Sequence, residues 1–220
     1  MNKLIVFGCS LSAQGHLKTW SDEVSSRLKL PLFNFAIPAS SNLLQVKRFQ
    51  EYVVNNHITN DDLIIWQITG VERGYKRISN RWPWIVPVNC DSDSFNGSIN
   101  YFDNKHRIDT LCHHKDSINS HVDEEEVLQE LVFHLKVAKK FTKNLLIIIG
   151  WDTAIPDDYI HLLKEFLNNN NIGYVDKSIL SHTIENNLPL LPDNAHPGEE
   201  AYISFANNCI IPTLKELGIV

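Results

Sequence analysis

Three short runs of almost purely apolar residues constrain the fold of this chain more than any other feature. They are Leu4–Phe7, Leu63–Ile68 and Leu145–Ile149. Strands that are buried on both faces have this composition, and such strands are typical of parallel sheets. Between the runs lie stretches in which apolar residues recur with helical spacing. This alternation of strand and helix predicts an α/β fold, with a mainly parallel sheet covered on both faces by helices.

Two weaker apolar segments, Pro31–Phe35 and Ile172–Val175, bring the predicted sheet to about five strands. The expected helices carry apolar stripes that face the sheet. Their members are Trp20, Val24 and Leu28; Leu43, Val46, Phe49 and Val53; Leu128, Leu131, Leu135 and Ala138; Tyr159, Leu162, Leu163 and Phe166; and Ala201, Phe205 and Cys209. A loop is expected from the fifth strand to Pro192, and Pro212 should kink or divide the last helix.

The length of 220 residues suits one α/β domain, so residues 1–220 are predicted to form a single unit without repeats or linkers. Residues 71–121 lack any sustained period. A structureless loop of this length is unusual in a compact domain unless it serves a function. The segment is therefore interpreted as an insertion or lid over the edge of the sheet, in which short helices can form.

Charge and composition exclude several classes of partner. The net charge is −6 and the basic residues form no cluster, which argues against nucleic acid or an anionic membrane as the main partner. No apolar run is long enough for a membrane helix. The chain begins directly in the first predicted strand, without a leader, and its four cysteines form no CxxC pair. Free thiols in a cytoplasmic protein are the expectation.

Ser10 is the candidate nucleophile. It follows the first strand and Gly8, at which the chain is expected to turn sharply. Ligands of open α/β sheets bind at the carboxyl ends of the strands, where Ser10 is placed. A serine hydroxyl needs a base, usually a histidine oriented by a carboxylate. The proline-flanked segment that holds Asp193 and His196 can supply both, although a serine in an ordinary turn remains the alternative.

Three segments together resemble the SGNH (GDSL-type) hydrolase superfamily, and the resemblance covers most of the chain. The first is Phe7–Ser12, in which the family's Gly-Asp-Ser has become Gly-Cys-Ser. The second is Asn34–Asn42, in which the glycine that donates an oxyanion N–H falls at Ala39. The third is Asp193–Pro197, which matches the family's D-x-x-H and is the closest of the three.

The resemblance implies a flavodoxin-like, three-layer α/β/α sandwich with about five parallel strands. It also implies that Ser10 is the nucleophile, His196 the base and Asp193 the residue that orients it. The N–H groups of Ser10 and Ala39 would bind the oxyanion. Ester hydrolysis or acyl transfer, often on acylated sugars, is the implied chemistry, and no metal or cofactor is predicted.

The family's remaining motif, Gly-x-Asn-Asp after the third strand, is absent. Val71 falls at or near the position of the asparagine that donates to the oxyanion, and valine cannot donate. Thr69, Gly70, Gln67 and Arg73 are the candidate substitutes. Loss of one such donor typically costs on the order of 100- to 1000-fold in rate.

Other residues allow more than one interpretation. Cys9 could itself be a nucleophile, or a small buried residue that points away from the cleft. Arg73 could bind an anionic group of the substrate or form an ion pair. Trp82 and Trp84, like Tyr101 and Phe102, could stack on sugar rings or anchor the insertion. The histidines around Cys112 suggest a possible zinc site, but their spacing fits no established ligand pattern. They are His106, His113, His114 and His121.

Three functional hypotheses follow. The first is a serine esterase that removes a short acyl group, for example an acetyl group from a carbohydrate. The second is a carbohydrate O-acyltransferase with the same first step, for which a lid would keep water out. The third is a sugar-binding relative with weak or no catalysis, suggested by the missing asparagine.

Overall fold

A computed structural model gives the fold of the chain. It describes residues 1–13, 17–38, 40–70, 74–77, 85–88, 124–151, 155–193 and 196–220, with the backbone alone for 74–77, 85–88 and 124. A parallel sheet has the strand order β2-β1-β3-β6-β7. Its strands are β1 (Leu4–Phe7), β2 (Leu32–Asn34), β3 (Leu63–Ile68), β6 (Asn144–Ile149) and β7 (Gly173–Tyr174). The predicted parallel sheet of about five strands is confirmed.

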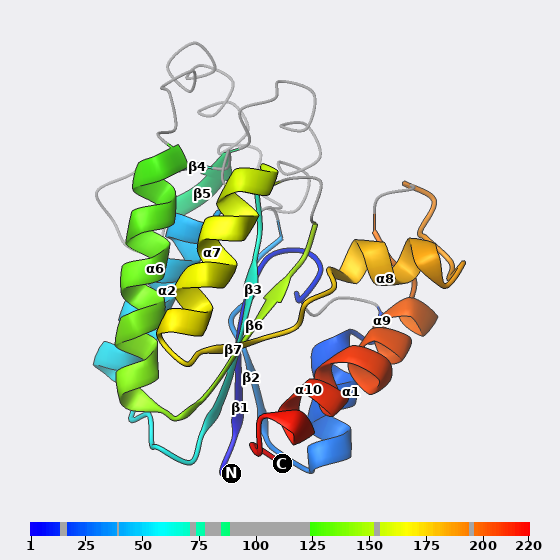
Figure 1. Cartoon of the computed structure of the whole chain (residues 1–220), viewed down its shortest axis with the longest axis horizontal. Helices are drawn as coiled ribbons and strands as arrows, with labels where there is room; N and C mark the ends of the chain where they lie inside the picture. Colours follow the sequence, from blue (N-terminus) through cyan, green and yellow to red (C-terminus); the bar gives the residue numbers. More distant parts are fainter. Residues whose placement is uncertain are drawn as a thin grey trace.

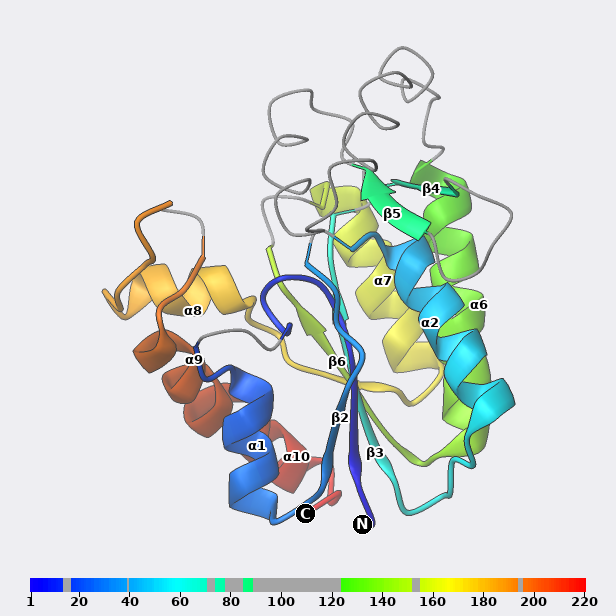
Figure 2. The same ribbon diagram turned by 180° about the vertical axis from the view of Figure 1, so that it is seen from behind.

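Helices cover both faces of this sheet, which completes the predicted three-layer α/β/α sandwich (Figures 1 and 2). One layer contains α2 (Asn42–Asn55), α6 (Glu124–Phe141) and α7 (Asp157–Asn169). The other contains α1 (Trp20–Leu28), α8 (Ile179–Glu185), α9 (Glu199–Phe205), η2 (Ala206–Ile210) and α10 (Ile211–Glu216).

Successive side chains of each central strand point to opposite faces of the sheet, so the apolar core has two layers. In β1, Ile5 and Phe7 pack towards α2 and α6, whereas Leu4 and Val6 pack towards α1 and η2. Every residue of β1, β3 and β6 is buried. Because both faces are covered, these strands are apolar except for Gln67 in β3 and Asn144 at the start of β6, and they do not alternate with polar residues. The register pairs Phe7 with Trp66, so β1 and β3 end at nearly the same level.

The helix that follows the first loop has a local explanation. Thr19 forms a capping box with Asp22, since the Thr19 backbone N–H and hydroxyl both donate to Asp22 Oδ2 at 2.9 Å. A capping box satisfies N–H groups that the first turn of a helix leaves without partners. Trp20 and Val24 then lie in the core, as their helical spacing predicts.

Three features differ from the expectation. The loop predicted before Pro192 contains a helix, α8, which starts at Ser178, whose hydroxyl accepts a hydrogen bond from Ser181 N–H. Within residues 71–121, the described residues include an antiparallel pair of strands, β4 (Gly74–Arg77) and β5 (Ile85–Val88), which the sequence did not indicate. The division at Pro212 occurs through the π-helical turn η2, which precedes the proline.

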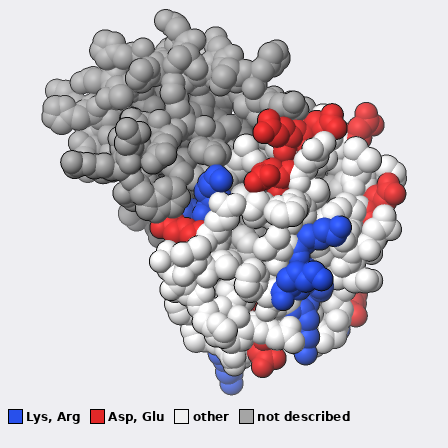
Figure 3. All heavy atoms as spheres, turned by 90° about the vertical axis from the view of Figure 1, so that its left-hand side faces the viewer, with Lys and Arg blue, Asp and Glu red and all other residues white. Residues whose placement is uncertain are grey.

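Charged side chains are distributed along α6 as a helix dipole favours. The chain enters this helix through consecutive glutamates and leaves it after Lys139 and Lys140. On the side of the molecule shown in Figure 3, acidic and basic side chains are mixed with uncharged ones. Among the described residues, no helix combines the length and the apolar character that a membrane span requires.

Candidate active site

Ser10 lies in a tight turn at the carboxyl end of β1. The backbone N–H groups of Ser12 and Ala13 both donate to the Cys9 carbonyl, at 3.0 and 2.9 Å. Gly8 precedes this turn without a positive φ, so the expected role in unusual backbone angles is wrong. Its role is close approach instead: a Cβ at Gly8 would lie 2.8 Å from Ser12 Cβ and 2.9 Å from Gln67 Oε1. Glycine leaves room for the chain to fold back over the strand end.

Asp193 holds His196 through two hydrogen bonds. The His196 backbone N–H donates to Asp193 Oδ1 at 2.9 Å, and His196 Nδ1 lies 2.6 Å from Asp193 Oδ2. The loop is also fixed by the hydrogen bond from Leu191 N–H to the His196 carbonyl, 2.7 Å, and by a β-bridge between Leu190 and Pro197. The backbone and the imidazole ring are therefore oriented by the same carboxylate.

His196 Nε2 lies 2.9 Å from Ser10 Oγ. Since a carboxylate can only accept, Nδ1 carries the hydrogen towards Asp193, and in the neutral ring Nε2 is then free to accept from the serine hydroxyl. The edge of the Trp151 ring system packs against the imidazole, with centroids 5.9 Å apart at 82°. The structure thus brings Ser10, His196 and Asp193 together in the order that nucleophilic catalysis requires.

Burial raises the pKa of Tyr202, and the neighbouring Cys9 and Asp193 raise it further. Tyr202 lies on α9, and only 4% of its surface is exposed. It therefore stays protonated over the whole physiological range.

Thr69 and Gly70, both predicted oxyanion donors, are buried beside the start of α2. Asn42 holds this segment: its Oδ1 accepts from Thr69 N–H at 3.0 Å, and its Nδ2 donates to the Thr69 carbonyl at 2.9 Å and to the Gly70 carbonyl at 3.4 Å. The Thr69 backbone N–H is therefore occupied and cannot bind an oxyanion. The Thr69 hydroxyl, in contrast, is fully buried and has no hydrogen-bond partner among the described residues.

Gln67, a predicted substrate contact, directs its side-chain amide to the turn that carries Ser10. Its side chain is completely buried, because it reaches under the Ser10 turn. Gln67 Oε1 accepts from Cys9 N–H at 3.1 Å and from the Ser12 hydroxyl at 2.7 Å, while Nε2 lies 3.0 Å from Cys9 Sγ. Cys9 is buried as well, as its alternative interpretation as a small core residue predicts.

Several predicted site residues lie outside the described part of the chain. Ala39, Val71, Arg73, Trp82 and Trp84 belong to this group, as do the residues of the possible zinc cluster. Their assignments stay predictions. Within the described residues, no group of three or more His, Cys, Asp or Glu side chains could hold a metal ion.

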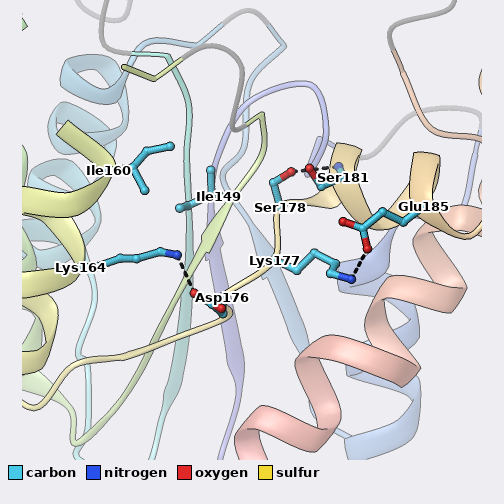
Figure 4. A pocket seen from close by; sticks show the side chains of 8 residues that line it. All are labelled: Ile149, Ile160, Lys164, Asp176, Lys177, Ser178, Ser181 and Glu185. Atoms are coloured by element: carbon cyan, nitrogen blue, oxygen red, sulfur yellow. Dashed lines mark hydrogen bonds and ion pairs between the residues drawn. The ribbon is translucent and has the colours of Figure 1, made fainter. Parts of the chain in front are cut away.

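A separate pocket of about 250 Å³ lies between α7 and α8, beyond the short strand β7 (Figure 4). Its charged side chains are paired: Lys164 Nζ lies 2.5 Å from Asp176 Oδ1, and Lys177 bonds to Glu185. Ile149 and Ile160 supply its apolar wall. None of the predicted site residues lines this pocket.

Sequence reasoning missed three residues that support the site. They are Asn42, Trp151 and Gln67 in its observed position. Asn42 carries a partial signal, since it lies in the second motif segment next to the helix start. A polar glutamine within the apolar run Leu63–Ile68 is a second signal, because a buried amide needs partners. Trp151 has no comparable signal, as its contact with His196 depends on the tertiary fold.

The chain is thus an α/β protein in which hydrogen bonds link Ser10 to His196 and His196 to Asp193. No family model and no curated protein sequence matches the chain. Solved structures do match. One is a member of the lipolytic G-D-S-L family from Veillonella parvula, with a TM-score of 0.57, 12% identity, and coverage of 98% of this chain and 97% of that one.

Two further neighbours have comparable similarity. The esterase EstA from Pseudoalteromonas sp., in a structure inhibited by monoethylphosphonate, has a TM-score of 0.54 and 14% identity, with 98% of each chain covered. The acetyl xylan esterase AlAXEase has a TM-score of 0.50 and 13% identity, with 93% and 96% covered. This chain shares the fold of the G-D-S-L family member and of these two esterases, which confirms at the level of the fold the resemblance drawn from its motifs.

Replacement of Asn42 tests whether its hydrogen bonds to the backbone of Thr69 and Gly70 stabilise the fold. Asn42→Ala leaves the Thr69 N–H buried without its acceptor, which typically costs about 1–3 kcal/mol. Urea unfolding of the variant should therefore show a lower midpoint. Asn55→Ala, in the same helix, is the control, because the Asn55 amide donates to a helix carbonyl from an exposed position. Equal midpoints for the two variants would contradict this role of Asn42.

Proposed function

We propose that this protein is a serine esterase that cleaves a short-chain acyl ester, with an O-acetylated carbohydrate as the substrate class. The observation that carries the proposal is the chain of hydrogen bonds from Ser10 Oγ to His196 Nε2, and from His196 Nδ1 to Asp193 Oδ2. These groups lie at the carboxyl edge of a parallel sheet, where α/β proteins bind ligands.

In the first half of the reaction, Ser10 Oγ attacks the acyl carbonyl carbon. His196 Nε2 takes the hydroxyl proton, and the Asp193 carboxylate stabilises the imidazolium that forms. The tetrahedral intermediate then collapses, the C–O bond to the alcohol breaks, and His196 Nε2 returns the proton to the departing oxygen. The product of this half is an acyl ester on Ser10 and a free alcohol.

In the second half, water replaces the alcohol. His196 Nε2 removes a proton from the water as its oxygen attacks the acyl-enzyme, and the same proton then returns to Ser10 Oγ. The carboxylic acid leaves. If a sugar hydroxyl took the place of water, the same site would transfer the acyl group, so assays with glycan acceptors should accompany assays of acid release.

The oxyanion would be bound by the backbone N–H groups of Ser10 and Ala39 and by the hydroxyl of Thr69. The case for Thr69 rests on its buried hydroxyl, which has no hydrogen-bond partner in the part of the chain that the structure describes, since a buried polar group without a partner is costly. Alternation along β3, continued by one residue, puts this side chain on the same side as Gln67, which lies under the Ser10 turn. The Thr69 hydroxyl would replace the asparagine donor that the family has near the position of Val71.

A carbohydrate as the acyl carrier is supported by two observations. One neighbour of the same fold is named an acetyl xylan esterase. Trp82 and Trp84 lie in the segment that follows the third strand, and aromatic rings of this kind can stack on sugars. Both tryptophans are proposed as contacts to the substrate, with Arg73 as a further polar contact.

Ser10→Ala should abolish the hydrolysis of p-nitrophenyl acetate and of acetylated oligosaccharides. Because the nucleophile is lost, kcat should fall at least about 1000-fold. Ser26→Ala, at an exposed position of α1, is the matched control and should keep full activity. Full turnover by Ser10→Ala, or loss of turnover in Cys9→Ala alone, would contradict the assignment of the nucleophile.

Thr69→Val removes the hydroxyl and keeps the shape of the side chain. If Thr69 binds the oxyanion, kcat should fall on the order of 100-fold while KM stays nearly constant, because the contact forms in the transition state. Thr183→Val serves as the control, since Thr183 is a buried threonine of α8 whose hydroxyl donates to the Ile179 carbonyl of the same helix. A kcat for Thr69→Val equal to that of the control would rule out this donor.

A further inference from the structure

Gln67 makes contacts that concentrate on one short turn. Its Oε1 accepts from both Cys9 N–H, at 3.1 Å, and Ser12 Oγ, at 2.7 Å. Its Nε2 lies 3.0 Å from Cys9 Sγ and 3.3 Å from the Ile68 carbonyl. Of these partners, Cys9 immediately precedes Ser10 and Ser12 lies two positions after it, whereas Ile68 is the next residue of β3. One buried amide therefore grips the turn on both sides of the serine.

A glycine follows each of the two strands that flank β3, and both glycines lie close to the Gln67 amide. A Cβ at Gly150, which follows β6, would lie 2.3 Å from Gln67 Nε2, and a Cβ at Gly8 would lie 2.9 Å from Gln67 Oε1. Any larger residue at Gly150 would force the amide to move. Gly8 and Gly150 thus form a narrow slot on either side of the Gln67 amide, which restricts the Gln67 side chain to one position.

Two more side chains form hydrogen bonds to Ser12. Trp20 Nε1 donates to Ser12 Oγ at 3.1 Å, and Asn34 Nδ2 donates to the Ser12 carbonyl at 2.6 Å. Because Ser12 Oγ accepts from Trp20, its own hydrogen is directed to Gln67 Oε1. Gln67, Ser12 and Trp20 are completely buried, so the hydrogen bonds among them are electrostatically stronger than at the surface.

We propose that Gln67 is a positioning residue that sets the conformation of the Ser10 turn. This inference rests on the proposed function, because it states what the turn is held for: to keep Ser10 Oγ at 2.9 Å from His196 Nε2 and to aim the Ser10 N–H at the oxyanion. Gln67 touches no reacting atom. It acts through the Cys9 backbone on one side of the serine and through the Ser12 hydroxyl on the other.

An apolar residue at position 67 would fill the slot but leave Cys9 N–H and Ser12 O–H without an acceptor. The turn would then relax, and a displacement of about 1 Å at a reacting atom can cost about 100-fold in rate. A carboxylate side chain would still accept from both groups. Gln67→Met and Gln67→Glu therefore separate the acceptor role of Gln67 from its bulk.

The test measures two properties of these variants: kcat and KM for p-nitrophenyl acetate, and hydrogen exchange of the backbone amides in residues 8–13. We expect Gln67→Met to lower kcat about 10- to 100-fold with KM within about twofold, and Gln67→Glu to recover at least part of that loss. In Gln67→Met the Cys9 amide should exchange faster, while the amides of Leu4–Phe7 stay protected.

Gln45→Met is the matched control. Gln45 is also a buried glutamine with one strong contact, from Trp66 Nε1 to its Oε1 at 2.7 Å, and it lies on the opposite face of the sheet. A merely structural role of Gln67 predicts that the two Met variants lose stability and kcat alike. That result would overturn the proposal, and so would a kcat for Gln67→Met within twofold of the native value.

The exchange measurement separates this proposal from the proposed function. If the native protein hydrolyses no ester, the esterase assignment fails. Faster exchange of the Cys9 amide in Gln67→Met, but not in Gln45→Met, would still support the control of the turn by Gln67. Unchanged exchange in both variants would overturn that control whatever the activity of the native protein.

Discussion

The hydrogen bond between Ser10 Oγ and His196 Nε2 joins residues 186 positions apart, and it sets the requirement that the rest of the fold must meet. Ser10 comes from the end of the first strand and His196 from the loop before the last helix. The two meet only because β1 lies inside a sheet whose strands all end at one edge. The 2.6 Å contact from Asp193 to His196 is local, by contrast, and needs only a fixed loop.

The sheet meets this requirement through burial on both faces. Phe7 in β1 and Trp66 in β3 lie in one layer of the core, and Val6 and Ile65 lie in the other. The buried polar side chains that contact the site lie where the strands end. There Gln67 bonds to the Ser10 turn and Asn42 bonds to the Thr69 backbone, so the same buried amides that satisfy the backbone also define the shape of the site.

Much of this structure could be predicted from sequence because it depends on local patterns. The strands β1 and β3, the helix that starts after Thr19, and the Asp193–His196 pair each follow from residues that are near one another in the chain. The helix α8 could not be predicted, because a seven-residue helix shows too little periodicity. The role of Gln67 was also out of reach, since a glutamine near a strand end reads equally well as a ligand contact. Only the approach of Gly8 and Gly150 to its amide distinguishes the two.

Reaction with a fluorophosphonate, followed by mass spectrometry of the peptide that contains residues 9 and 10, tests most directly whether His196 activates Ser10. The native protein should gain one phosphonyl group, located on Ser10 by fragmentation. The His196→Ala variant should react at least about 100-fold more slowly, because no base remains to take the serine proton. Absence of labelling in the native protein, labelling on Cys9, or equal rates with and without His196 would contradict the account.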